Sequence, residues 1–154
     1  MNQSAKTLLT AIGGTTGMTA GSALMSLIMK ENYKEPEHLG TMISRLAPGL
    51  SKSSKQIAGW GAHYAMGIVF ASVFVELWET RKIKHNMKNA LILGLASGVL
   101  GLLIWKATFK IHPLPPALHY RDFYLQRIPA HMVYAVFATL SYRMLLNSRL
   151  NVTS

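Results

Sequence analysis

The residues of this chain that could most readily do chemistry are its histidines, of which there are six. Imidazole gains and loses a proton at about pH 6.5, and it also binds metals and haem iron. His63 and His131 stand out, because each follows an alanine near the start of a long apolar stretch. A polar side chain at that depth of a membrane helix faces other helices or a water-filled cavity. We therefore expect His63 and His131 to face the interior of the protein.

Three interpretations of the histidines remain open from the sequence. In the first, each ring hydrogen-bonds a neighbouring carbonyl or hydroxyl group and holds two helices together. In the second, His63 and His131, with His112 and His119 on the same side, sense acid or conduct protons, because two protonated rings would push their helices apart. In the third, two histidines on facing helices ligate haem iron, although no Cys-x-x-Cys-His attachment sequence is present. We assign no metal ligands and expect no cofactor.

No enzyme motif accompanies the histidines. The chain lacks the Gly-x-Ser-x-Gly elbow, the phosphate-binding Gly-Lys-Ser/Thr sequence and the His-Glu-x-x-His zinc motif. It also has no cysteine, which excludes disulfides, thiol catalysis and iron–sulfur clusters. We therefore name no catalytic residue and expect a non-enzymatic protein.

Four long apolar stretches must position the histidines: residues 7–29, 57–77, 89–109 and 128–146. The only charged residues within them are Glu76, Lys106 and Arg143. A helix that crosses a membrane needs about 20 apolar residues. Only 14% of the whole chain is charged, against about 25% in soluble proteins. The sequence therefore predicts an all-α fold, a four-span transmembrane helical bundle that forms one integral membrane domain over residues 1–154.

Both outer loops are expected to contain a short interfacial helix. Within residues 30–56, apolar side chains recur at helical spacing, namely Leu39, Met42, Ile43 and Leu46. Residues 51–55 follow as a polar linker. Within residues 110–127, a proline-rich start gives way to an aromatic and charged segment that begins at Tyr120. Charge complementarity suggests that Asp122 pairs with Arg121 or Arg127, and that Glu79 pairs with Arg81 or Arg143.

The basic residues indicate contact with lipid and set the expected orientation. The net charge is +10, but the basic side chains sit in loops and at span ends, without interleaved aromatic residues. This distribution is typical of contact with anionic lipid, so we expect the lipid bilayer as partner and no nucleic acid. The densest basic run, Arg81-Lys82-Ile83-Lys84, fills the short middle loop. Positive residues favour the cytoplasmic side, which places both termini in the cytoplasm.

Glycines recur at a spacing that favours close helix packing. The first stretch carries Gly13, Gly17 and Gly21, and the third carries Gly94 and Gly98. Glycines four residues apart form a flat strip that another helix can approach closely. A strip on the first span that faces lipid would allow an alternative function, that of an accessory subunit docking on a larger membrane complex, or a homo-oligomer. A small channel or transporter is a further alternative.

The order of these features is similar to that of a known family. It runs from Ala62-His63-Tyr64 through Phe70-Ala71 to Glu76, then through a basic linker, a glycine-rich span, a loop with Pro113 to Pro116 and a last span that opens with His131. Over about residues 62–146 the chain resembles the YagU-like family of small bacterial inner-membrane proteins. The resemblance implies a multi-pass helical protein of the bacterial inner membrane, but no reaction. With the histidines, it leads us to expect an envelope or acid-response role.

Overall fold

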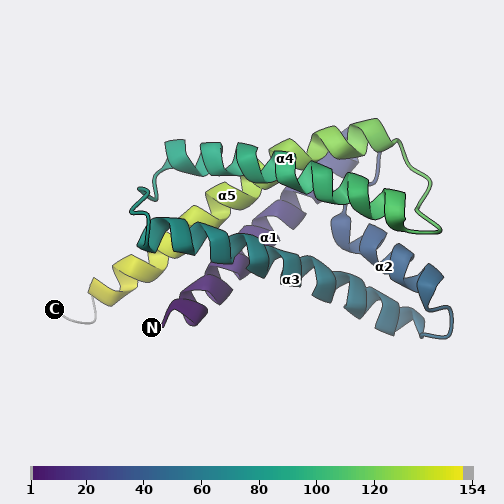
Figure 1. Ribbon diagram of the computed structural model, residues 1–154, viewed down its shortest axis with the longest axis horizontal. Helices are drawn as coiled ribbons and strands as arrows, with labels where there is room; N and C mark the ends of the chain where they lie inside the picture. The colour runs from purple at the N-terminus through teal and green to yellow at the C-terminus, as the bar shows by residue number, and fades with distance from the viewer. Residues whose placement is uncertain (1, 151–154) are drawn as a thin grey trace.

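The computed structural model describes residues 2–150, which form five α-helices and no strand. The helices are α1 (Gln3–Met29), α2 (Glu35–Leu46), α3 (Lys52–Glu79), α4 (Met87–Ile111) and α5 (Tyr120–Leu150). α2 is much shorter than the other helices, as Figure 1 shows. The all-helical class predicted from the sequence is confirmed.

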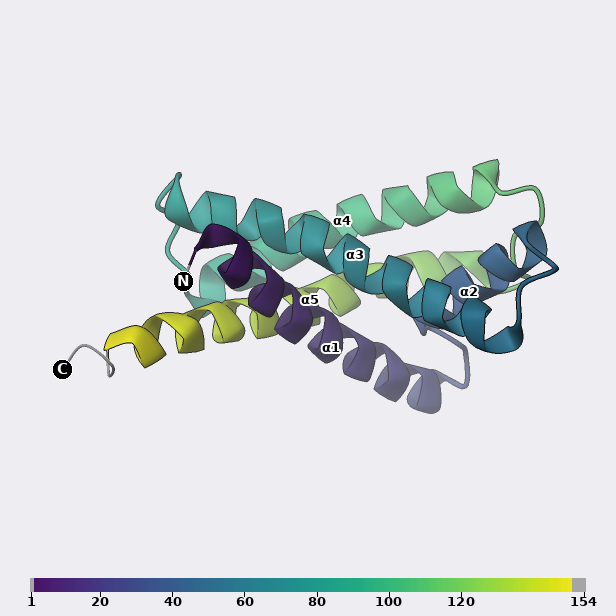
Figure 2. The ribbon, with the colours of Figure 1, turned by 90° about the horizontal axis from the view of Figure 1, so that it is seen from below.

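The long helices run in alternating directions between the two ends of the molecule (Figures 1 and 2). The start of α1, the end of α5 and the turn between α3 and α4 lie at one end of the molecule (Figures 1 and 2). The other three connections lie at the opposite end, where α2 packs against the first half of α3. The most extensive helix contacts are those of α5 with α4 and of α5 with α1. α5 is therefore the central element of the bundle.

Local capping explains where the helices begin. Ser51 precedes α3 and accepts a hydrogen bond from the backbone N–H of Ser54, and Asn86 does the same for Asn89 at the start of α4. Side-chain oxygens in this position satisfy N–H groups that a helix start leaves unpaired. Because Ser51 caps α3, residues 52–55 form its first turn. The expectation of a polar linker over residues 51–55 was therefore wrong.

The expected interfacial helix in the last loop is the beginning of α5 instead. α5 runs without a break from Tyr120 to Leu150 and contains Pro129. A proline inside a helix removes one backbone hydrogen bond and usually kinks or ends the helix. Here the turns before it are held by aromatic packing on the end of α4, where the Phe123 ring lies 5.1 Å from that of Trp105 and 5.4 Å from that of Phe109. This contact keeps the helix continuous through Pro129.

Glycines bring α4 and α1 close to α5. A Cβ atom on Gly98 would lie 2.8 Å from the Cα atom of Ile128, and one on Gly94 would lie 2.6 Å from that of Met132. Only a residue without a side chain fits at such distances. The glycines of α1 face α5 as well, with Gly13 against Ser141, Gly17 against Phe137 and Gly21 against Val133. The strip on α1 is therefore covered within the chain, and its expected role as a lipid-facing docking surface is wrong.

Among residues 2–150, two helices, α3 and α4, are long and apolar enough to cross a membrane. In the most apolar 18-residue window of each, only 33% of the residues are buried. Their large apolar side chains therefore point mostly outward, and they include Ile68, Val69 and Val73 on α3 and Ile92, Leu95, Val99 and Leu103 on α4. A core helix of a soluble protein buries such residues.

Within the described part of the chain, in contrast, a set of eleven polar side chains is buried in the interior. Those buried are Thr10, Thr15, Ser22, Glu35, His38, His63, Ser97, Gln126, Arg127, His131 and Thr139. Buried polar groups need partners, because each loses its hydrogen bonds to water. The interior of this bundle is therefore where its chemistry lies.

Candidate functional site

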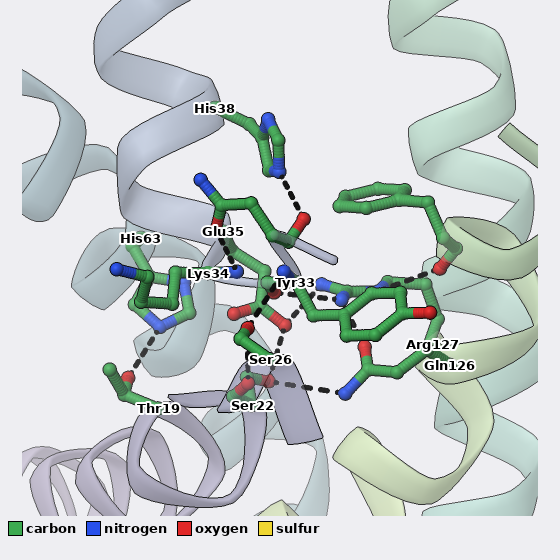
Figure 3. Close-up of polar contacts among 12 residues, drawn as sticks. Thr19, Ser22, Ser26, Tyr33, Lys34, Glu35, His38, His63, Gln126 and Arg127 are labelled. Atoms are coloured by element: carbon green, nitrogen blue, oxygen red, sulfur yellow. Dashed lines mark hydrogen bonds and ion pairs between the residues drawn. The ribbon is translucent and has the colours of Figure 1, made fainter. Parts of the chain in front are cut away.

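A buried ion pair joins α2 to α5. The side chain of Arg127 is completely buried and that of Glu35 is 1% exposed, and Nη1 of Arg127 donates to Oε1 of Glu35. The same guanidinium donates from Nη2 to the Tyr33 carbonyl oxygen at 3.0 Å and from Nε to the Phe123 carbonyl oxygen at 3.2 Å. Figure 3 shows these contacts converging on Arg127. Its charge is thus balanced by one carboxylate and solvated by backbone dipoles.

The start of α2 places the Glu35 side of the pair. Glu35 is the first residue of α2 and is followed by Pro36, both of which suit a helix N-terminus. Ser22 of α1 donates to Glu35 Oε1 at 3.1 Å and accepts a hydrogen bond from Gln126 Nε2 at 3.4 Å. Side chains from α1, α2 and α5 therefore meet around one carboxylate. Its second oxygen, Oε2, has no hydrogen-bond partner.

Next to this carboxylate lies a cavity of about 170 Å³. Its walls come from all five helices, with Thr15, Met18, Glu35, Leu39, Ala62, His63, Met66, Gly67, Phe70, Gly101, Ile104, Trp105, Thr108, His131 and Tyr134 as lining residues. α3 and α4 provide two facing walls and diverge from the turn that joins them (Figures 1 and 2). The lining is predominantly apolar, with a few polar groups at its inner end.

Both histidines singled out in the sequence line this cavity. His63 Nε2 lies 2.9 Å from the Thr19 hydroxyl group, which links α3 to α1. The His131 ring lies 4.7 Å from the Phe70 ring, in an edge-to-face arrangement, and packs against the backbone of Gly101. The Nδ1 atom of His131 is buried and has no hydrogen-bond partner. In the view of Figure 3, the Glu35 carboxylate lies between the His63 ring and the Arg127 guanidinium.

The other histidines lie elsewhere, so the outer histidines do not form one cluster. His112 Nε2 is 3.2 Å from the Met42 carbonyl oxygen, and His119, 75% exposed, places Nδ1 2.9 Å from a carboxylate oxygen of Glu31. His38 is buried, with Nε2 2.8 Å from the Asn32 carbonyl oxygen and its ring edge-on to Phe123. Burial lowers the pKa of His38 below its ordinary value.

The sequence did not reveal the ion pair at the centre of the site. Asp122 was expected to pair with Arg121 or Arg127, but Arg127 pairs with Glu35. Glu79 was expected to pair with Arg81 or Arg143, but it pairs with Lys6 of α1. One signal was available, since Arg127 directly precedes a long apolar stretch in a helix whose earlier turns are aromatic. The identity of its partner depends on how α2 folds back.

Among residues 2–150, no three His, Asp or Glu side chains converge to hold a metal ion. The cavity, at about 170 Å³, is also below the ~300 Å³ at which pockets for drug-sized ligands begin. A porphyrin would not fit it. Comparison with protein-family models, with curated proteins and with solved structures finds no match. The chemistry of the site must therefore be argued from its hydrogen-bonding and proton-binding groups.

Proposed function

We propose that this chain is a non-enzymatic, multi-pass inner-membrane protein that responds to acid through His63 and His131. The observation that carries the proposal is that these two buried rings, from separate helices, line one cavity. The proposal agrees with the resemblance to the YagU-like family. In this proposal the two histidines respond to acid, in addition to forming hydrogen bonds that hold helices together.

The first part of the proposal is that four helices cross the membrane. α1 is 27 residues long, which gives about 40 Å of helix and exceeds a hydrocarbon core of about 30 Å. Its polar Thr10, Thr15 and Ser22 are buried, whereas Leu8, Leu9, Ile12, Leu24 and Leu27 are exposed. The same holds for α5, where Phe137, Leu140 and Met144 face outward. Thr10, Thr15 and Ser22, which lower the mean hydropathy of α1, thus do not face lipid.

The second part concerns what protonation would do. A protonated His131 would place a cation against Phe70 and in the same interior as Arg127, with no free carboxylate except the unpartnered oxygen of Glu35. The titratable groups that line the cavity with it are His63 from α3, Glu35 from α2 and Tyr134 from α5. Two charged rings in one apolar cavity repel each other and need water. His63 belongs to α3 and His131 to α5, and α5 packs tightly on α4. We therefore expect acid to separate α3 from the α4–α5 pair and to hydrate the cavity.

Distance measurements between spin labels test this response. The chain has no cysteine, so Val69→Cys on α3 and Leu95→Cys on α4 introduce labels at exposed sites without a background. Because burial opposes protonation of imidazole, the titration must reach well below the ordinary histidine pKa of about 6.5. In lipid nanodiscs, lowering the pH from about 8 to about 4 should lengthen the distance between labels by about 2 Å or more.

A paired control separates the cavity histidines from the rest. Combining His63→Gln with His131→Gln should abolish the change in label distance. His119→Gln should leave it intact, because His119 is exposed and outside the cavity. An unchanged distance in the wild-type chain, or an equal change in the double variant, would contradict the proposed acid response.

A further inference from the structure

The cavity has features of a ligand site that an acid response does not need. We propose that it binds one small neutral molecule with an apolar body and a single hydroxyl or N–H donor, for which phenol is the probe. Its volume of about 170 Å³ is close to that of an apolar cavity of about 150 Å³ known to bind benzene. A single aromatic ring with one substituent therefore matches the space.

The inner end of the cavity offers an unused hydrogen-bond acceptor. The Glu35 side chain is 1% exposed and lines the cavity, yet its Oε2 atom has no partner, because Arg127 and Ser22 both contact Oε1. A buried carboxylate oxygen without a partner is costly. A ligand hydroxyl group would satisfy it, and His131, whose Nδ1 atom also has no partner, lines the same cavity.

The charges of the site favour a neutral ligand. Glu35 and Arg127 already form a pair in which one negative charge balances one positive charge. A cationic ligand would compete with Arg127 for the only carboxylate of the cavity lining, in an interior that stabilises charge poorly. An anionic ligand would meet the free oxygen of Glu35 and be repelled. A neutral donor meets neither obstacle.

The remaining walls suit an aromatic or other apolar body. Phe70, Trp105 and Tyr134 supply rings, and Met66, which is 41% exposed, lies between the interior and the outer surface. α3 and α4 diverge on this side and carry exposed apolar residues. A molecule dissolved in the hydrocarbon region could therefore enter from the side, between these two helices.

Fluorine NMR on the wild-type chain in nanodiscs tests the site directly. At about pH 8, where imidazole is neutral, 4-fluorophenol should give a saturable bound signal that excess phenol displaces. Fluorobenzene has nearly the same shape but no donor, and it should bind at least about tenfold more weakly, because Glu35 Oε2 stays unpaired. Only non-saturable partition into lipid, or equal binding of the two compounds, would overturn the proposal.

A pair of alanine positions on α3 provides a matched control. Ala62 lines the cavity, whereas Ala65 is exposed and does not. Ala62→Phe should fill the cavity and abolish the bound signal, and Ala65→Phe should retain it. If Ala62→Phe bound 4-fluorophenol with the affinity of the wild-type chain, the ligand would bind outside the cavity and the proposal would be wrong. If Ala62→Phe does not fold, the comparison of 4-fluorophenol with fluorobenzene on the wild-type chain still tests the proposed site. Neither experiment depends on the acid response.

Discussion

Arg127 and Glu35 form an ion pair that is out of contact with solvent on both sides, and it joins the last long helix to the short α2. Each partner has further contacts, with the Arg127 guanidinium 4.1 Å from the centre of the Phe123 ring and Glu35 held by Ser22. The pair fixes the position of Glu35 Oε2 relative to the cavity. Its integrity therefore determines both the stability of that end of the bundle and the shape of the candidate site.

Breaking one side of this pair is predicted to be severe. Arg127→Met or Glu35→Gln leaves an uncompensated buried group, and each should lower the free energy of unfolding by about 3–5 kcal/mol. Replacing both residues, as Glu35→Gln with Arg127→Met, should cost clearly less than the sum of the single changes. Denaturant titration of the four proteins in detergent, monitored by circular dichroism, gives the values.

The pair between Lys6 and Glu79 is the control for that experiment. Its side chains keep some contact with solvent, at 16% and 25% exposed, so Lys6→Met should cost less than Arg127→Met, about 1–2 kcal/mol. If Arg127→Met were as mild as Lys6→Met, the ion pair with Glu35 would not be a major element of stability.

The sequence predicted the helices but not the contacts among charged side chains. Apolar stretches are local signals, and they located α1, α3 and α4 to within five residues at their ends. α5, in contrast, begins eight residues before the predicted stretch 128–146. The partner of Arg127 could not be predicted, because Glu35 is 92 positions away in the chain and reaches it only after α1 and α2 fold against α5. Asp122 is nearer in sequence, which made it the obvious but wrong partner.

The residue at which α5 begins was also not determined by the sequence. The aromatic and charged segment that begins at Tyr120 favoured a short helix in the last loop, separate from the last span. The structure continues the helix because Phe123 packs on Trp105 and Phe109 of α4. That contact is made in the tertiary structure, so no local rule for proline could have anticipated it.

Close packing between α4 and α5 predicts a sharp difference between two glycines. Gly98→Ala should lower the free energy of unfolding by about 1–3 kcal/mol, because the added Cβ atom meets the Cα atom of Ile128 at 2.8 Å. Gly61 on α3 has nothing within 4 Å of such a Cβ atom, so Gly61→Ala should be neutral or stabilise by up to about 1 kcal/mol. The same titration measures both, and equal effects would argue against the tight α4–α5 contact.

The burial of His38 predicts that acid weakens the packing of α2. Because burial lowers the pKa of His38 in the folded state, the unfolded state binds a proton first as the pH falls. The contribution of His38 is then complete above its unfolded pKa of about 6.5 and declines as the pH falls through that value towards the lower folded pKa. His38→Gln should remove this part of the pH dependence.

Hydrogen exchange of the α2 amides, compared at about pH 7.5 and pH 5.5 after correction for intrinsic rates, measures this local effect. Wild-type α2 should lose protection at the lower pH more than the His38→Gln variant does. His119→Gln, which changes an exposed ring, should behave as the wild type. Identical losses in wild type and His38→Gln would show that other groups control the acid sensitivity of α2.

The proposed four-span orientation makes opposite predictions for the two ends of the bundle. The turn between α3 and α4 contains the densest basic run, and it lies at the same end as the start of α1. A cysteine at Lys84 should therefore react with a membrane-impermeant thiol reagent only in inverted vesicles, and one at Ser53, beside the start of α3, only from outside intact cells. Both positions are exposed or partly exposed and lie outside the cavity. Labelling of both from the same side would mean that α3 does not cross the membrane, and the four-span arrangement would then be wrong.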